Sequence, residues 1–243
     1  TRHLAEFLND RPRIDAVLFN GGSVRPPLLR QRLREQIGGW QDGLVPQVLE
    51  NEEPDLAVAR GAGGDYAAAV AGLRKLSQRD GNDPRVWYEL GKYSILSGDA
   101  QHAVDDDLVR ALVQFKRSRN LYGEAETVNA LGIGYGRLGQ SADAAEQYRK
   151  AVALRHAVGN RRGEATSLRN LGNALSLAGQ FDEAAAHLEQ ARTLHAQLGD
   201  RAGLAAVENE LGLLAEERGN FTGALQAFQR ALKAWQDVGD PLG

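Results

Sequence analysis

The chain has 243 residues, of which 42% are hydrophobic, and a formal net charge of -3. This length and composition allow one large or two small domains with a buried core. A slightly acidic chain argues against a dedicated nucleic-acid-binding protein, and no apolar run reaches the length of a membrane span.

The residue types exclude several kinds of site. Cysteine is absent, so we expect no disulfide, no thiolate zinc site and no cysteine nucleophile. His187 and His195 are too far apart for the usual one-turn spacing of two helical metal ligands, and we expect no metal site. No secretory signal is visible from Thr1 to Asp10, which favours a cytoplasmic location, and a first residue Thr1 indicates a fragment or processed product.

The first 63 residues have an α/β pattern. The apolar run IDAVLF, residues 14–19, suits a buried strand, and VPQVLE, residues 45–50, suits a second one. Residues 27–37 predict an amphipathic helix with proline in its first turn, and residues 54–63 predict another helix start. A segment this short cannot close such a sheet alone, because both faces of a parallel sheet need covering.

A glycine-rich loop follows the first predicted strand. The residues from Asn20 to Pro26 read NGGSVRP, and those from Asp55 to Ala62 read DLAVARGA. Both segments resemble the ATPase domain of the DnaK-like seventy-kilodalton heat-shock chaperones, a branch of the actin-type ATPases. In that family a strand ends in Gly-Gly-Ser/Thr-x-Arg followed by proline, and a helix of the second pattern closes the domain.

This resemblance implies a loop against the adenosine of ATP, formed by Gly21, Gly22, Ser23 and Arg25. The Arg25 guanidinium would stack on the base. The alternative is that the two glycines only turn the chain and that Arg25 is a surface residue. The phosphate loops, Mg²⁺-positioning carboxylates and catalytic lysine of the family have no recognisable counterpart here. Part of a nucleotide cleft cannot hold a triphosphate for in-line attack, so we expect no cofactor in this chain alone, and ATP with Mg²⁺ only in a longer parent.

From Gly64 onward the chain is rich in alanine and repeats itself. A Leu-Gly pair recurs with its leucines 41, 40 and 40 residues apart, at Leu90, Leu131, Leu171 and Leu211. Seven residues after each Leu-Gly glycine comes a further glycine: Gly98, Gly139, Gly179 and Gly219. Repeats of this length are typical of a solenoid, in which each unit is stable only when stacked on its neighbours.

One unit is predicted to hold two helices. Residues 167–179 suit the first and residues 181–199 the second, with Gly179 in the turn between them. Gly172 and Ala184 are expected where the two helices cross closely. Large side chains are expected to fill the remaining space: Phe181, Leu188, Phe221 and Phe228.

This pattern resembles the tetratricopeptide repeat family, with a small residue after leucine in the first helix and alanines in the second. Residues 87–91, WYELG, match the family's opening Trp-x-x-Leu-Gly motif. The resemblance covers about residues 64–240, in units longer than the usual length of about 34. It implies a mainly α fold: a right-handed α-solenoid of helix pairs at residues 64–243, beside a small α/β segment at residues 1–63 that resembles part of an actin-type ATPase fold.

Three segments of the chain depart from the regular pattern, and the repeat alignment suggests an interpretation of each. The first unit lacks its first helix, since residues 64–69 fit only a turn and a second helix. The unit from Pro84 carries one extra residue, placed at Asp105 to Asp107, and these acids are either an interaction patch or, as we prefer, a solvated face. Residues 134–139, GYGRLG, formally satisfy a dinucleotide motif, but they end a helix with no strand before it.

The concave side of the array, lined by the first helices, is the predicted binding surface. In the family resembled, this groove holds peptides or partner helices. Repeat alignment assigns to it Tyr88, Lys92, Asn129, Ile133, Arg169, Asn173, Asn209 and Leu213, together with Ile95, Gly136, Ser176 and Glu216. Asparagine can hold an extended backbone and Arg169 or Lys92 a carboxylate, while Glu216 and Glu217 make the far end acidic. The alternative is a wet surface whose polar residues bind nothing.

The sequence favours a protein–protein interaction scaffold, not an enzyme, with a peptide or partner helix as its ligand and neither nucleic acid nor membrane as a partner. Two alternatives remain open: the C-terminal part of a DnaK-like ATP-dependent chaperone whose repeats recruit clients or co-chaperones, and a peptide-sensing regulatory module. The oligomeric state is also open. Phe228 and Trp235 either form an exposed stripe that docks another helix or pack on the preceding repeat.

Overall fold

The computed structural model of the chain describes residues 16–18, 35, 47–49, 66–79 and 81–238. The chain divides into two compact units, Thr1–Arg79 and Asp80–Gly243. The predicted domain boundary after residue 63 and the loop residues Gly21, Gly22, Ser23 and Arg25 lie outside the described residues.

The first unit contains a pair of short parallel strands. β1 (Ala16–Leu18) and β2 (Gln47–Leu49) pair with Ala16 opposite Gln47. Each lies inside one of the two strands predicted from the sequence. The unit ends with α4 (Tyr66–Arg79), a helix that buries Ala69 and Leu73, where the sequence predicted the second helix of an incomplete repeat.

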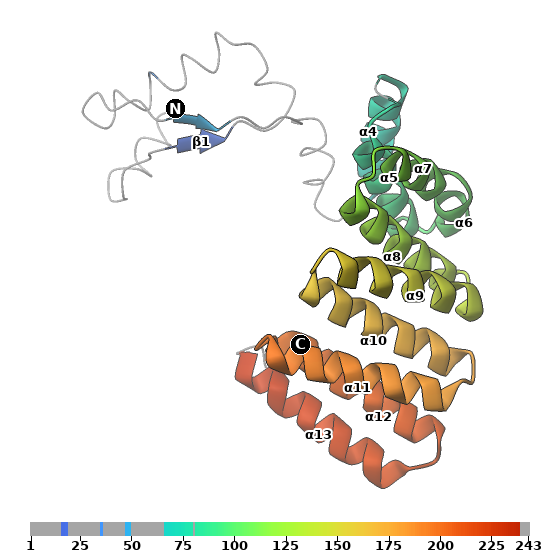
Figure 1. Cartoon of the computed structure of the whole chain (residues 1–243), viewed down its shortest axis with the longest axis vertical. Helices are drawn as coiled ribbons and strands as arrows, with labels where there is room; N and C mark the ends of the chain where they lie inside the picture. The colour runs from blue at the N-terminus through green and yellow to red at the C-terminus, as the bar shows by residue number, and fades with distance from the viewer. Residues whose placement is uncertain (1–15, 19–34, 36–46, 50–65, 80, 239–243) are drawn as a thin grey trace. The chain divides into compact units, whose positions relative to one another are not determined.

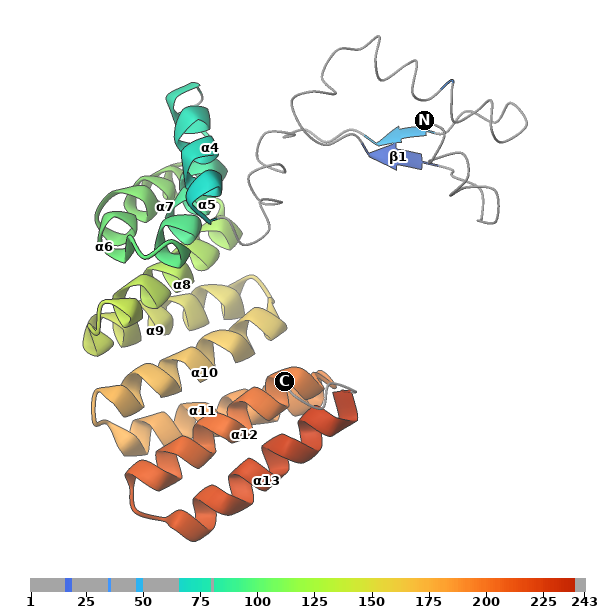
Figure 2. The same cartoon turned by 180° about the vertical axis from the view of Figure 1, so that it is seen from behind.

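The second unit is a stack of helix pairs (Figures 1 and 2). Its helices are α5 (Pro84–Leu96), α6 (Ala100–His102), η2 (Ala103–Asp107), α7 (Leu108–Arg117), α8 (Leu121–Arg137), α9 (Ser141–Ala157), α10 (Arg161–Leu177), α11 (Phe181–Gln197), α12 (Arg201–Glu217) and α13 (Phe221–Val238). From α5 to α13 each helix packs on the next one along the chain, and α12 also contacts α10. The predicted repeating helix pairs are therefore confirmed. Among the described residues, no helix is both long and apolar enough to cross a membrane.

Glycine ends the first helix of each pair. Gly139, after α8, has a φ of 74°, and Gly98, Gly179 and Gly219 also have positive φ values. This left-handed conformation suits glycine because a β-carbon would crowd the backbone. The dinucleotide-like run at residues 134–139 is thus the end of a helix, as the repeat predicted.

A close glycine contact holds the two helices of a pair together. A β-carbon added to Gly172 on α10 would lie 2.6 Å from Cγ of Leu188 and 3.2 Å from the backbone oxygen of Ala184, both on α11. The predicted crossing of Gly172 and Ala184 is confirmed. The corresponding glycines face large side chains in the same way: Gly91 faces Leu108, Gly132 faces Tyr148, and Gly212 faces Phe228.

A second glycine contact joins each pair to the next. A large side chain near the end of one second helix lies against a glycine in the first turn of the following helix: Phe115 on Gly123, Arg155 on Gly163, and His195 on Gly203. The backbone N–H of each of these glycines donates to the residue that caps the helix, Asn120, Asn160 or Asp200. These caps satisfy N–H groups that a helix start leaves unpaired.

The extra residue of the unit from Pro84 forms a π-helical turn. η2 spans Ala103–Asp107 inside the helix that runs from α6 into α7. A π turn closes one residue later than an α turn, so the insertion is absorbed there. Asp107 is fully buried and accepts a hydrogen bond from Ser94 at 3.0 Å, so the expectation of a solvated acidic face is wrong for this residue.

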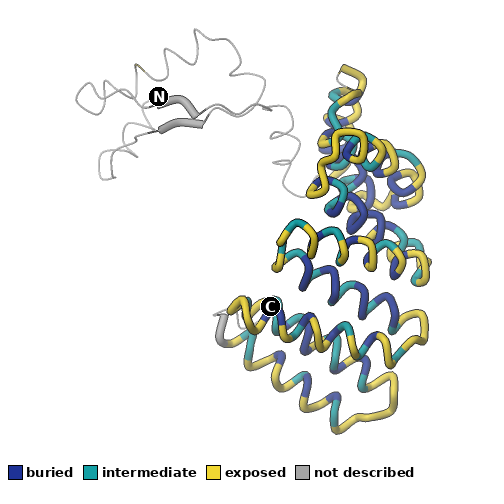
Figure 3. The backbone as a smooth tube through the Cα atoms, viewed as in Figure 1, coloured by how far each residue is buried: buried dark blue, intermediate teal, exposed yellow. Residues whose placement is uncertain are grey.

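Buried residues concentrate on the helix faces between neighbours, whereas the turns are exposed (Figure 3). Leu171, Leu175 and Leu188 are among the largest fully buried side chains. Phe181 packs on the same core cluster, as predicted. The expectation for Phe221 is wrong, because this side chain is 70% exposed at the start of α13.

The Gly172 contact predicts an unusual response to alanine. Alanine normally stabilises a helix by up to about 1 kcal/mol relative to glycine. We expect Gly172→Ala instead to destabilise the chain by about 1–3 kcal/mol, because Leu188 and the α11 backbone must move. Urea unfolding followed by circular dichroism measures the change.

Gly136→Ala is the matched control, since a β-carbon there meets no atom within 4 Å. This variant is expected to be as stable as the parent chain or slightly more stable. Equal midpoints for the two variants would contradict the close crossing at Gly172.

The His195 contact predicts a pH-dependent stability. Burial lowers the pKa of the His195 imidazole, against the opposing effect of its hydrogen bond to Asp200. Arg162 and Arg169 lower this pKa further. Because the unfolded chain binds this proton at a higher pH than the folded chain, the free energy of unfolding is expected to fall as the pH drops below about 6.5.

Thermal melts of the parent chain and of His195→Phe between pH 5 and pH 8 check this expectation. Phenylalanine is the residue that fills the equivalent place at Phe115, so the variant keeps the packing and loses the titrating group. We expect a smaller loss of stability at acid pH in the variant. Parallel profiles for the two proteins would rule out His195 as the source.

Candidate functional site

The predicted groove residues all lie on first helices of the pairs, namely α5, α8, α10 and α12. They differ in exposure. Ile133 is 39% exposed and Leu213 is 42% exposed, and Asn209 is also exposed. Four others are half-buried: Tyr88, Lys92, Arg169 and Asn173. Asn129, by contrast, is only 9% exposed.

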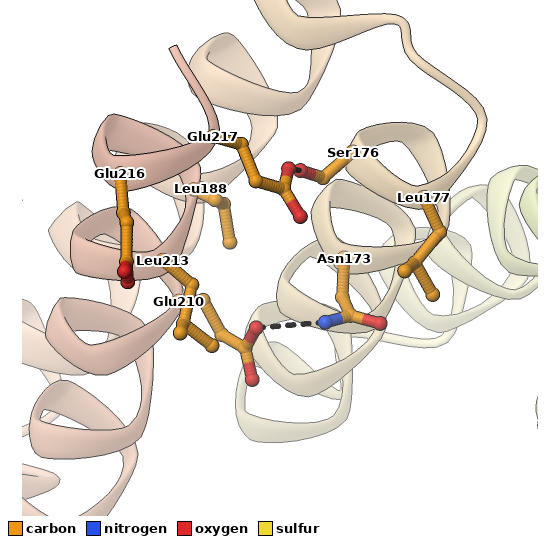
Figure 4. A pocket seen from close by; sticks show the side chains of 8 residues that line it. All are labelled: Asn173, Ser176, Leu177, Leu188, Glu210, Leu213, Glu216 and Glu217. Atoms are coloured by element: carbon orange, nitrogen blue, oxygen red, sulfur yellow. Dashed lines mark hydrogen bonds between the residues drawn. The ribbon is translucent and has the colours of Figure 1, made fainter. Parts of the chain in front are cut away.

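A pocket of about 380 Å³ lies between α10 and α12 (Figure 4). Its lining comes from three helices: Asn173, Ser176 and Leu177 of α10, Leu188 of α11, and Glu210, Leu213, Glu216 and Glu217 of α12. The volume falls in the range of roughly 300–1,000 Å³ that is typical of ligand sites. The structure thus brings together four predicted groove residues, Asn173, Ser176, Leu213 and Glu216.

Two hydrogen bonds cross this pocket from α10 to α12 (Figure 4). The side-chain amide of Asn173 donates to Glu210 Oε2 at 2.7 Å, and the Ser176 hydroxyl donates to Glu217. Both acceptors are carboxylates and both donors are neutral. The bonds fix the walls of the pocket without neutralising their charge.

Asn129 belongs to a buried network instead of the open groove surface. Its Oδ1 accepts a hydrogen bond from Ser167 at 3.1 Å, and Ser167 accepts one from Arg155 at 2.9 Å. Arg155 also donates to Glu126 at 2.9 Å and to the backbone oxygen of Gly163 at 2.8 Å. This network ties α8, α9 and α10 together, so Asn129 has a structural partner whether or not it meets a ligand.

The α5 end of the groove carries a cation that is already paired. The Lys92 ammonium lies 3.0 Å from Glu89 Oε2 and 5.2 Å from the centre of the Tyr88 ring. Burial raises the pKa of the Tyr88 phenol, and the nearby carboxylates of Glu126 and Glu89 raise it further. Tyr88 therefore stays neutral at physiological pH.

Aligning the repeats of this chain with one another did not identify three of the lining residues, Leu177, Leu188 and Glu210. Alignment treated each unit as equivalent and chose fixed positions relative to the repeated leucine. The pocket is built between adjacent units, so α12 contributes Glu210, one residue before its repeated leucine, and α10 contributes Leu177, six residues after its own. The hydrogen bond from Asn173 to Glu210 spans 37 residues, a spacing that the 40-residue period does not indicate.

One cluster among the described residues has the composition of a cation site. Ligand atoms of His102, Asp106 and Asp107 lie within 4.8 Å of one another. Each carboxylate already has a protein partner, since Asp107 accepts from Ser94 and Asp106 accepts from Arg110 at 2.7 Å. We assign no metal to this cluster.

The described part of the second unit is a solenoid of stacked helix pairs with a pocket between α10 and α12. The family model described as tetratricopeptide repeat matches residues 123–197 and again residues 163–237. These residues therefore resemble tetratricopeptide repeats, in agreement with the resemblance that the sequence pattern indicated. No curated protein sequence matches the chain.

Solved structures of similar fold cover most of this chain. MamA is 20% identical, covers 79% of this chain and 98% of its own, and has a TM-score of 0.57. The repeats of a putative kinesin light chain from Podosopora anserina are 18% identical, with 78% and 99% covered and a TM-score of 0.65. The apo form of RapI is 14% identical, with 76% and 69% covered and a TM-score of 0.67. At these identities the likeness establishes the fold alone. None of these comparisons supports the resemblance of residues 1–63 to a DnaK-like ATPase.

The two asparagines at equivalent repeat positions are expected to respond differently to truncation. Asn129→Ala removes a buried hydrogen bond and should destabilise the chain by about 1–2 kcal/mol. Asn209→Ala, on the exposed face of α12, should change stability by less than about 0.5 kcal/mol. Urea midpoints measure both, and equal losses would contradict the structural role of Asn129.

Proposed function

We propose that this chain is a protein–protein interaction scaffold that binds a peptide or a partner helix along the inner helices of its repeat array. The observation that carries the proposal is the pocket between α10 and α12, which combines exposed apolar side chains with fixed polar groups. Leu213 and Leu177 are 42% and 63% exposed, so apolar surface is accessible to a ligand at this pocket. Apolar side chains next to oriented polar groups are typical of binding sites.

The same surface extends along the array to α8. Ile133 is exposed on α8 at the position equivalent to Leu213 on α12, with Asn173 between them on α10. We propose Tyr88, Lys92, Asn129, Ile133, Arg169, Asn173, Asn209 and Leu213 as the groove residues, with Asn129 acting through its buried network. Because these residues lie on packed helices, the surface is ordered before a ligand arrives, which reduces the entropy lost on binding.

The proposal assigns no catalytic step and no cofactor to the chain. The alternative of a DnaK-like chaperone depends on residues 1–63, where the adenosine-side loop lies outside the described residues. A peptide-sensing regulatory module would use the same groove and differ only in the response that binding triggers. Neither alternative is favoured by the fold or by the matched family.

Selection from a displayed library of random dodecapeptides tests the proposal while the natural partner is unidentified. We expect enriched peptides that bind the parent chain and that lose about tenfold or more in affinity for Leu213→Asp, because a charge then replaces an apolar contact at the pocket. Fluorescence anisotropy of labelled peptides measures the affinities.

Leu225→Asp on the outer helix α13 is the matched control, since it makes the same change at another exposed leucine. It should leave the affinities unchanged. A library that yields no peptide, or peptides weakened equally by both variants, would remove the groove as the binding surface.

A further inference from the structure

The pocket between α10 and α12 has an uncompensated negative charge. Glu210, Glu216 and Glu217 line it, and no lysine, arginine or histidine lines it with them. Glu210 and Glu217 accept hydrogen bonds from neutral side chains. Among the residues that the structure describes, none of the three glutamates forms an ion pair.

Several other carboxylates of the array form ion pairs with neighbouring arginines. Glu208, also on α12, pairs with Arg230 at 2.8 Å. In a second hollow, between α10 and α11, Glu164 pairs with Arg161 at 3.1 Å and Glu189 pairs with Arg192 at 2.7 Å. The pocket between α10 and α12 therefore differs from its surroundings in the pairing of its acids.

The two cations that the repeat alignment assigned to the groove have other contacts. Arg169, one turn before Asn173 on α10, donates to Asn170 at 3.3 Å. Lys92 is paired with Glu89 on α5. Neither supplies the missing positive charge to the α12 carboxylates.

Apolar side chains lie among these carboxylates. Leu213 lies on the same wall as the glutamates, Leu177 lies opposite on α10, and Leu188 closes the back of the pocket (Figure 4). A lysine or arginine side chain matches this arrangement, because its aliphatic stem covers apolar surface while its charged end reaches polar groups. The Asn173 amide oxygen adds a neutral acceptor beside the carboxylates.

We infer that this pocket receives a lysine or arginine side chain from a partner segment that also carries aliphatic residues. The inference rests on the proposed function and adds the chemistry of the ligand. The ammonium or guanidinium group lies between Glu210 and Glu217, and a neighbouring aliphatic side chain of the segment contacts Leu213 and extends toward Ile133.

Two defined peptides test this inference. One is a fluorescein-labelled dodecapeptide in which pairs of lysines alternate with pairs of leucines, and the other has glutamate in place of every lysine. We expect the lysine peptide to bind the parent chain at least about tenfold more tightly than the glutamate peptide. Its affinity should weaken as the salt concentration rises, because salt screens the charges.

Two triple variants distinguish the effect of the pocket carboxylates from the effect of the net charge of the chain. Glu210→Gln with Glu216→Gln and Glu217→Gln removes three charges from the pocket and retains acceptors for Asn173 and Ser176. Asp143→Asn with Glu146→Gln and Glu183→Gln removes three charges from the outer helices α9 and α11. We expect the pocket variant to lose about tenfold or more in affinity for the lysine peptide and the outer variant to lose less than about threefold.

Equal losses in the two variants would overturn the inference, since they would show attraction to net charge alone. Equal binding of the glutamate peptide would also overturn it. Spermine that binds as tightly as the lysine peptide, with the same dependence on the pocket, would assign the site to a polyamine and not to a protein segment.

The library selection distinguishes this failure from a failure of the proposed function. Enriched peptides that depend on Leu213 but carry no excess of lysine or arginine would leave the scaffold function standing and remove the cationic ligand. Enrichment of lysine or arginine beside aliphatic residues, lost on the pocket variant, would support both.

Discussion

The close approach of helices over glycine is the constraint on which the rest of the array depends. Gly172 allows α10 to lie against Leu188 within a pair, and Gly203 allows α12 to receive His195 from the preceding pair. A β-carbon at Gly172 or Gly203 would lie within 3 Å of Leu188 or His195, so the neighbouring side chain would have to move. Because both contacts recur in each unit, the separation between neighbouring first helices is also fixed, and with it the width of the pocket between α10 and α12.

The units share this frame of glycine contacts but differ in the side chains at the predicted groove positions. At equivalent positions α8 presents Ile133, α10 presents Asn173 and α12 presents Leu213. The frame holds each side chain at a set place, and the local sequence decides whether that place is apolar, neutral or charged. Under the proposed function a partner would contact these side chains as separate positions along the array, and our inference places its cationic side chain in the acidic pocket.

Much of this frame could be predicted from the sequence because it depends on local geometry. The turn glycine Gly139, the crossing of Gly172 and the extra residue near Asp107 can all be derived from the period and from residue size. The burial of Asn129, the exposure of Phe221 and the contact of Asn173 with Glu210 could not be predicted in this way. These depend on how one unit is offset against the next, and a single sequence with a 40-residue period contains no direct signal for that offset.

The π turn at η2 has a consequence for the evolution of repeat arrays of this kind. One added residue in an α-helix rotates every later side chain by about 100°, since a turn holds 3.6 residues. Here the π turn at Ala103–Asp107 confines that rotation to a few residues. Leu108, the first residue of α7, still packs against Gly91. A single-codon insertion can therefore persist in one unit without disturbing the register of the later units. The length of a repeat can therefore change by one residue while the glycine contacts between its helices are preserved.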